Sequence, residues 1–257
     1  MTTSARDQRI AVVTGASSGI GEATARTLAG QGFHVIAVAR RADRIAALAG
    51  EIGGTGIVTD VTDPAAVAAM ARECEQVCDS LSGSINVLVN NAGGARGLAS
   101  VEQADLEHWR WMWETNVLGT LHVTRALLPK LVASGDGLVV TVTSIAAFEI
   151  YDGGAGYTSA KHAQSALHRT LRGELLGKPV RLTEIAPGMV DTEFSLVRFD
   201  GDRDRADAVY SGLTPLTSAD IAEVIGFVAS RPPHVDLDQI VIRPRDQASA
   251  TRAHRRV

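Results

Sequence analysis

The feature that most constrains the fold is a regular alternation of short apolar runs with longer segments of helical periodicity. Seven runs predict strands, at residues 10–14, 34–39, 56–58, 87–90, 138–142, 181–186 and 239–242. Between them the sequence predicts helices at 19–31, at 41–51, from 64 onward, and at 105–134, 157–176 and 218–230. Short runs that are apolar throughout are typical of strands buried on both faces of a parallel sheet. Repeated strand–helix–strand units therefore predict one seven-stranded parallel sheet with helices on both faces.

This α/β pattern predicts a doubly wound, Rossmann-like fold in a single dinucleotide-binding domain of 257 residues. Domains of this class commonly reach such a length as one unit, and no linker or low-complexity segment divides the chain. The core is expected to run from residue 8 to 243, followed by a tail from 244 to 257. The basic run 252–256 in that tail is interpreted as a frayed, solvated chain end.

Composition argues against several functional classes. A formal net charge of −4 gives no basic excess of the kind that binds nucleic acid. No apolar run approaches the roughly 18 residues that a membrane-spanning helix needs, and residues 1–7 lack the apolar centre of a signal peptide. The two cysteines, Cys74 and Cys78, are too few for a zinc site, so no metal is expected. We predict a cytoplasmic protein with reduced thiols.

A glycine-rich turn joins the first predicted strand to the first helix. Residues 14–21 place Gly15, Gly19 and Gly21 in the spacing Gly-x-x-x-Gly-x-Gly. Glycines permit a tight turn and a close approach of backbone N–H groups to phosphate, and the helix N-terminus favours the negative charge. Glycines in such a loop can also be merely structural. The strand-to-helix context favours a dinucleotide-binding turn here.

The end of the second predicted strand indicates which dinucleotide is bound. NAD-binding folds usually carry an acidic residue at this point, whereas this chain has Arg40 and Arg41 and no acid before Asp43. A carboxylate would repel the 2′-phosphate of NADP, and a guanidinium can bind it through two hydrogen bonds. The alternative is that both arginines are solvated residues at a helix start. We predict a preference for NADP(H).

A tyrosine and a lysine lie four residues apart in a later predicted helix. Tyr157 and Lys161 therefore share a helix face, and Ser144 precedes the tyrosine by thirteen residues. An ammonium group beside a phenol lowers the phenol's pKa, which lets it exchange protons near neutral pH. Such a tyrosine can act as a general acid or base on an alcohol or ketone. Alone, the Tyr-x-x-x-Lys pattern is weak, because any helix with a tyrosine can show it by chance.

These motifs together resemble the short-chain dehydrogenase/reductase family. Besides the glycine turn, Ser144 and the Tyr157–Lys161 pair, the chain has Asn116 and the run Asn-Asn-Ala-Gly at 90–93, in the family's order, over residues 10 to about 242. The resemblance implies that Tyr157 is the general acid or base and that Lys161 lowers its pKa and binds the nicotinamide ribose. It implies that Ser144 hydrogen-bonds the substrate oxygen and that Asn116 holds a water in a proton relay. A mid-helix amide bonded to backbone is the alternative for Asn116.

The resemblance also implies a set of cofactor-binding residues on the loops after the strands. They are Gly15, Ser17, Ser18, Gly19, Ile20, Gly21, Arg40, Arg41, Asp60, Val61, Asn91, Ala92, Gly93, Tyr157, Lys161, Pro187, Gly188, Val190 and Thr192. Asp60 and Val61 would contact adenine, and the run from Asn90 to Gly93 would line the adenosine ribose and the floor of the cofactor site. Val190 and Thr192 would hold the carboxamide.

Within the family, residues 192–199 and 231–244 are similar to a branch of NADP-dependent 3-hydroxy acid and serine dehydrogenases. An acidic substrate needs a cationic partner, and Arg198 is the candidate, together with Ser144 and Tyr151. Arg198 could instead be a surface residue paired with Asp200 or Asp202. Glu149, the other candidate substrate residue, would repel a carboxylate unless it is turned away or paired.

Three alternatives to the 3-hydroxy acid prediction follow from the same residues. A neutral ketone or aldehyde would suit a site that contains Glu149. A dinucleotide-sensing protein without turnover would need only the glycine turn, and the intact catalytic set argues against it. An epimerase or dehydratase with tightly held NAD would better fit an acid where Arg40 stands. The partner of an enzyme of this family is a small alcohol or carbonyl compound, and the resemblance implies a homotetramer, or a dimer.

Overall fold

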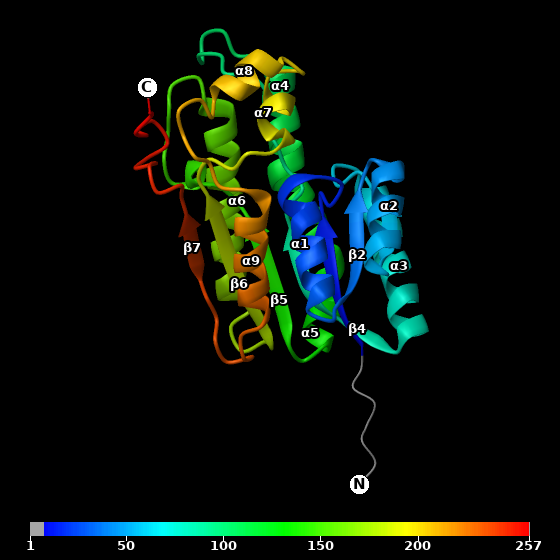
Figure 1. Ribbon diagram of the computed structural model, residues 1–257. Coiled ribbons are helices and arrows are strands. Elements are labelled where there is room, and N and C mark those ends of the chain that lie inside the picture. The colour runs from blue at the N-terminus through cyan, green and yellow to red at the C-terminus, as the bar shows by residue number, and fades with distance from the viewer. Residues whose placement is uncertain (1–7, 257) are drawn as a thin grey trace.

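The computed structural model describes residues 8–256 and contains one parallel sheet of seven strands. The strand order is β3-β2-β1-β4-β5-β6-β7, so the direction in which the sheet grows reverses between β1 and β4 (Figure 1). The strands are β1 (Gln8–Thr14), β2 (His34–Ala39), β3 (Thr55–Val58), β4 (Gly83–Asn90), β5 (Gly137–Val142), β6 (Val180–Pro187) and β7 (Gln239–Ile242). The predicted doubly wound α/β fold is confirmed.

Side chains alternate between the two faces of the sheet and build two cores. Ala11 and Val13 of β1 belong to a core with α1 (Gly19–Gly30), α2 (Ala42–Ile52) and α9 (Ser218–Ala229). Ile10 and Val12 belong to the other, with α3 (Pro64–Leu81) and α5 (Gly119–Ala133). This alternation is the period of two that any strand has. Because both faces are covered, the strands contain few polar residues, and that is why the sequence revealed them.

The ends of several elements differ from prediction by one or two residues, and one strand differs by four. β4 begins at Gly83 and pairs with β1 from Gln8 onward. Its first residues, Gly83 and Ser84, are not apolar, so the apolar run indicated only the second half of the strand. Asp63 caps α3 as predicted, by accepting a hydrogen bond from the N–H of Ala65.

The long helix predicted at 105–134 is three segments in the structure. α4 (Leu106–Trp113) and α5 are joined by a π-helical turn, η1, at Glu114–Leu118. Such turns are uncommon and often lie at functional sites. The predicted helix at 157–176 is α6, which spans Ala155–Glu174.

Two short helices that the sequence did not predict follow β6. They are α7 (Glu193–Arg198) and α8 (Arg203–Ala208), and they cover the carboxyl end of the sheet (Figure 1). We call residues 192–210 the lid. No helix within residues 8–256 combines the length and the apolar character that crossing a membrane requires.

The chain end at 252–256 is mostly exposed, as predicted, but it is not frayed. The backbone N–H of Arg256 donates to the carbonyl of Gly212, and the Arg255 guanidinium donates to the carbonyls of Val209 and Ser211. Gly212 has a φ of +70°, and a Cβ there would lie 2.6 Å from the carbonyl oxygen of Arg256. The tail is therefore bound to the end of the lid, through backbone contacts that its charge pattern does not reveal.

Candidate active site

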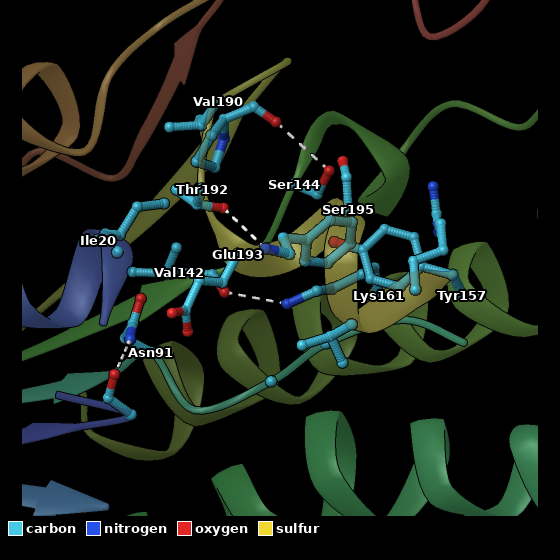
Figure 2. Close-up of a pocket in the computed structure, with 18 of the residues that line it drawn as sticks. Ile20, Asn91, Val142, Ser144, Tyr157, Lys161, Val190, Thr192, Glu193 and Ser195 are labelled. Atoms are coloured by element: carbon cyan, nitrogen blue, oxygen red, sulfur yellow. Dashed lines mark hydrogen bonds between the residues drawn. The ribbon is translucent and has the colours of Figure 1, made fainter. Parts of the chain in front are cut away.

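A cavity of about 650 Å³ lies at the carboxyl ends of the strands, beneath the lid (Figure 2). In open parallel sheets, ligands bind at this edge, where the strand order reverses. All the residues that the resemblance implied for the cofactor line this cavity, with one exception, Gly21. Among the implied catalytic residues, Ser144, Tyr157 and Lys161 line it, and Asn116 does not.

The glycine turn needs its glycines for two different reasons. Gly15 and Gly19 have φ values of +65° and +58°, which other residues rarely adopt. A Cβ at Gly21 would lie 2.4 Å from the carbonyl oxygen of Gly15, so Gly21 allows α1 to pack closely on the turn. Ser18, the N-cap of α1, makes no side-chain capping bond. The turn thus offers a helix N-terminus to an anion in the cavity.

Of the two arginines after β2, Arg41 contacts the glycine turn. Its guanidinium donates to Ser17 Oγ at 3.0 Å and to Ser18 Oγ at 2.6 Å. Arg40 also lines the cavity, but its side chain is 63% exposed and lies 3.9 Å from the carboxylate of Asp60. The sequence could not rank the two, and in the structure Arg41 is the one bonded to the glycine turn.

Thr14 organises the floor of the cavity. Its hydroxyl donates to the carbonyl of Val89 and accepts from the N–H groups of Asn91 and Ala92, while Asn91 Nδ2 donates to the carbonyl of Thr14. β1 and β4 are thereby tied together where the strand order reverses. A Cβ at Gly15 would lie 2.9 Å from Ala92 Cα, so this close contact also depends on glycine.

Tyr157 and Lys161 lie on one face of α6, as their spacing predicted, and Ser144 lies at the end of β5 opposite them (Figure 2). Lys161 Nζ lies 5.8 Å from the centre of the Tyr157 ring. It donates to the carbonyl of Val142 at 3.1 Å and to Gln164 Oε1 at 2.8 Å. Both side chains are buried.

Burial shifts the pKa values of both side chains. Burial raises the pKa of Tyr157 above its usual value, and Arg198 and the Ser144 hydroxyl oppose that rise. Burial also lowers the pKa of Lys161 to about 7, with Glu184 opposing. The sequence predicted that Lys161 would lower the tyrosine pKa. Arg198 is a second cation that favours the phenolate, and the lysine amine is hydrogen-bonded to Val142 and Gln164.

Asn116 lies at the centre of the π-helical turn and is fully buried. Its side chain donates to the carbonyls of Gly94 and Met112 and accepts from the N–H of Gly94. The amide is thus bonded to backbone, as the alternative interpretation held. The backbone carbonyl of Asn116 accepts a hydrogen bond from Thr120 Oγ1 at 2.9 Å.

Gln164 connects the backbone carbonyl of Asn116, through Thr120, to Lys161. Gln164 Nε2 donates to Thr120 Oγ1 at 2.8 Å, and Gln164 Oε1 accepts from Lys161 Nζ. Gln164 is fully buried on α6, one turn from Lys161. The sequence analysis missed this residue, although its place three residues beyond the lysine, on the same helix face, could have indicated it.

The substrate end of the cavity is formed by the lid and the loop after β5. Arg198 Nη2 donates to Tyr151 Oη at 2.7 Å, and its guanidinium lies 5.1 Å from the Tyr157 ring centre. Its Nε is buried without a hydrogen-bond partner. Among the described residues no carboxylate pairs with Arg198, and Asp202 instead caps α8. The interpretation of Arg198 as a surface residue paired with a lid acid is therefore wrong.

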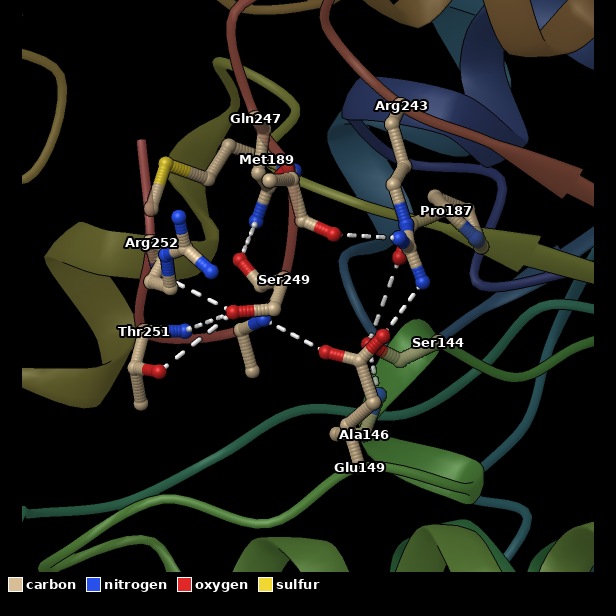
Figure 3. A network of polar contacts seen from close by, with 12 residues as sticks. Ser144, Ala146, Glu149, Pro187, Met189, Arg243, Gln247, Ser249, Thr251 and Arg252 are labelled. Atoms are coloured by element: carbon tan, nitrogen blue, oxygen red, sulfur yellow. Dashed lines mark hydrogen bonds and ion pairs between the residues drawn. The ribbon is translucent and has the colours of Figure 1, made fainter. Parts of the chain in front are cut away.

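Glu149 does not line the cavity. Its carboxylate is bonded to the Arg243 guanidinium and accepts from the N–H of Ala250 (Figure 3). The side chain therefore anchors the C-terminal tail, and its charge is neutralised there. The repulsion that the sequence suggested between Glu149 and an acidic substrate is removed by this pairing.

Residues of the tail and the lid also line the cavity without having been predicted. Gln247 is buried and accepts from the N–H of Met189 at 2.8 Å, and Ala250 and Arg255 lie on the same side. Glu193 lies beside Arg41. Only the tertiary fold brings the tail here, so no local signal could have indicated Gln247 or Arg255.

The chain matches the family model described as short chain dehydrogenase over residues 9–201. It is 78% identical to an uncharacterized oxidoreductase of Mycobacterium tuberculosis over 252 residues, covering 98% of this chain and 97% of the relative. It is 42% identical to a serine 3-dehydrogenase of Agrobacterium fabrum over 242 residues, covering 93% and 95%. A closed serine dehydrogenase complexed with NADP+ is similar in structure, with a TM-score of 0.87, 36% identity and coverage of 96% and 100%.

Proposed function

The chain belongs to the short-chain dehydrogenase family, and from this membership and its cavity we propose an NADP(H)-dependent oxidoreductase that interconverts a secondary alcohol and a carbonyl. We propose a small 3-hydroxy acid or β-hydroxy amino acid as its substrate. The serine 3-dehydrogenase relative and the NADP+ complex of its structural neighbour support both choices.

The cavity fits a dinucleotide phosphate. The glycines leave room that a Cβ at Gly15 or Gly21 would fill, the N-terminus of α1 is open, and Arg41 lies beside the serines of the turn. We propose that Arg41, with Arg40, binds the 2′-phosphate and that Ser17 and Ser18 assist. When bound, the nicotinamide supplies or accepts the hydride.

The side chains at the other end of the cavity would handle the proton. We propose that Tyr157 Oη donates a proton to the carbonyl oxygen during reduction and accepts one from the alcohol during oxidation. Ser144 would donate a hydrogen bond to the same oxygen as negative charge develops. Lys161 lies one helical turn beyond Tyr157 and would bind the nicotinamide ribose. The raised pKa of Tyr157 keeps a proton on the phenol, which suits the role of acid.

The observation that carries the substrate proposal is the position of Arg198. A buried donor without a partner is costly, and a bound carboxylate would satisfy it. The carboxyl carbon of a 3-hydroxy acid is two bonds from the reacting carbon. An acid held by Arg198 would therefore place its hydroxyl near Tyr157, whose ring lies 5.1 Å from the guanidinium.

This substrate proposal is tested with two compounds of one carbon skeleton, 3-hydroxybutyrate and its methyl ester, in the wild type and Arg198→Met. We expect KM for the acid to rise about 10- to 100-fold, since a hydrogen bond to a charged group contributes about 1.5–3 kcal/mol, and KM for the ester to stay within about twofold. An equal change for both compounds would instead mean that Arg198 only shapes the lid. A wild type that prefers the ester would favour neutral ketones and alcohols as substrates.

We also propose that the enzyme is a cytoplasmic homo-oligomer, a tetramer by family resemblance. Leu106 and Trp113 of α4 and Leu121 of α5 are exposed, and exposed apolar side chains gathered on neighbouring elements favour a subunit contact. The free thiols of Cys74 and Cys78 suit a reducing compartment. Light scattering at micromolar concentration measures the oligomeric state, and a monomer would contradict the proposal.

A further inference from the structure

Glu193, the first residue of α7, lies in the region that we propose for the 2′-phosphate. One carboxylate oxygen accepts from Arg41 Nη1 at 2.8 Å, and the other accepts from Arg44 Nη1 at 2.8 Å. These hydrogen bonds from Arg41 and Arg44 lower the pKa of Glu193 to about 2, and the Ser18 hydroxyl contributes to the same effect. The carboxylate is therefore ionised across the neutral range.

The groups that hold Glu193 are those that a phosphate would use. Carboxylates and phosphates are recognised by the same guanidinium geometry. Arg41 divides its donors between Glu193 and the two serines of the glycine turn. A 2′-phosphate bound to Arg41 would thus meet a second anion at the same guanidinium, and the two would repel each other.

Glu193 also connects this region to the lid. Its neighbour Thr192 caps α7, and the helix ends at Arg198, the residue proposed to hold the substrate carboxylate. The helix has six residues, so Glu193 and Arg198 are separated by less than two helical turns. The Arg41–Glu193 and Arg44–Glu193 pairs tie α7 to the start of α2 across the cavity mouth.

We propose that Glu193 is a specificity residue for the coenzyme: its carboxylate occupies the anion site of Arg41, and the 2′-phosphate displaces it. This inference rests on the proposed use of NADP(H). Displacement frees the first turn of α7, so the lid responds to a coenzyme that carries the 2′-phosphate. NAD lacks that group and leaves Glu193 paired. The Glu193 carboxylate lowers the affinity for the phosphorylated coenzyme, and release of the lid depends on the 2′-phosphate.

Binding of two coenzyme fragments tests this proposal without turnover. Isothermal titration calorimetry measures Kd for 2′,5′-ADP and 5′-AMP, which differ only by the 2′-phosphate, in the wild type, Glu193→Gln and Glu51→Gln. The control residue Glu51 pairs with Arg26, outside the cavity lining, and its loss removes the same charge. Glu193 makes two half-exposed ion pairs, each of modest strength, so we expect Glu193→Gln to bind 2′,5′-ADP about two- to thirtyfold more tightly. Kd for 5′-AMP should stay within about twofold, and Glu51→Gln should match the wild type.

An unchanged or weaker affinity of Glu193→Gln for 2′,5′-ADP would overturn the inference, because Glu193 would then support the arginine rather than compete for it. A wild type that binds 2′,5′-ADP no more tightly than 5′-AMP would overturn the proposed NADP(H) preference itself. Trypsin cleavage after Arg203 of α8 provides a second measurement. We expect 2′,5′-ADP to accelerate it in the wild type, and Glu193→Gln to be cleaved faster without ligand. Equal rates in all states would show that the lid does not depend on this contact.

Discussion

The buried amine of Lys161 predicts a pH-dependent stability that a single substitution removes. Burial lowers the pKa of Lys161 from 10.5 to about 7 in the folded protein, whereas the unfolded chain keeps the ordinary value. Its only hydrogen-bond acceptors among the described residues are the carbonyl of Val142 and the side chain of Gln164. Lys161→Met retains most of the side-chain volume and removes the titrating group.

The sign follows from proton binding. Between pH 7 and 10.5 the unfolded chain holds a proton on Lys161 that the folded protein has lost, so the free energy of unfolding rises with pH. The slope is about 1.4 kcal/mol per pH unit where the difference is one full proton. Above pH 10.5 the amine is neutral in both states and adds no penalty. As the pH falls towards 7, stability is lost, and below 7 the full desolvation cost remains.

The measurement is urea unfolding at pH 7, 8 and 9, at one protein concentration because the chain is proposed to oligomerise. We expect the free energy of unfolding of the wild type, relative to Lys161→Met, to increase by about 2 kcal/mol between pH 7 and 9. Other titrating groups cancel in this difference. Tyr157 stays neutral over the range because burial raises its pKa.

Lys130→Met is the matched control. Lys130 is exposed, and its hydrogen bond with Glu75 raises its pKa, so it remains protonated in both states up to pH 9. The control and the wild type should therefore show parallel pH dependences. If the Lys161→Met and wild-type curves are also parallel, Lys161 is charged in the folded protein at pH 7 to 9, and the account of burial is refuted.

Three further substitutions give separate expectations. Gly21→Ala places a Cβ 2.4 Å from the Gly15 carbonyl oxygen. We therefore expect the free energy of unfolding in urea to fall by about 1–3 kcal/mol and calorimetry to show weaker binding of 2′,5′-ADP. Unchanged values would mean that α1 can shift freely. Gln164→Leu removes one of the two acceptors of the Lys161 amine, so the pH at which the Lys161-dependent stability begins to rise should fall below 7 in the same titrations. If that pH is the same as in the wild type, Gln164 contributes only packing and does not affect the protonation of Lys161. Glu149→Gln removes the charged partner of the tail, so trypsin should cut within 252–256 faster, as followed by mass spectrometry, and equal rates would show that the tail is held elsewhere.

The sheet could be predicted from the sequence because its determinants are local. Parallel strands covered on both faces are apolar at nearly every position, so the runs in β1, β2 and β5 are visible without knowledge of their partners. The same argument explains the missed half of β4, since Gly83 and Ser84 pair with β1 at the sheet's end and need no apolar side chain. Apart from the first half of β4, the described strands thus follow from pattern alone.

The π-helical turn and the lid could not be predicted in the same way. Nothing in residues 113–118 breaks a helix, and the extra residue in the turn accompanies hydrogen bonds from Asn116 to Gly94, 22 positions away. The lid helices each have six residues, too few to show a periodicity. Their caps, Thr192 and Asp202, were visible in the sequence and are the signal that could have indicated them.

The candidate site shows the same division between local and non-local information. Tyr157 and Lys161 are neighbours because a helix brings positions four apart together, and this holds in any fold. Their protonation depends on what surrounds them, and the sequence showed the cation beside the phenol but not the acceptors that hold it, the carbonyl of Val142 and the side chain of Gln164.

Arg198 and Glu193 carry this argument one step further. They lie at opposite ends of α7, and each is a charged group whose partner belongs to another element: Tyr151 for the arginine, Arg41 and Arg44 for the glutamate. An acidic substrate and a 2′-phosphate would each act on one end of this helix. The carboxylate of Glu149, which would repel an acid if it were unpaired, is bonded to Arg243. The only carboxylate hydrogen-bonded to a cavity-lining arginine among the described residues is therefore that of Glu193, at the coenzyme end. At the other end, Arg198 offers an acidic substrate a guanidinium that is hydrogen-bonded to Tyr151.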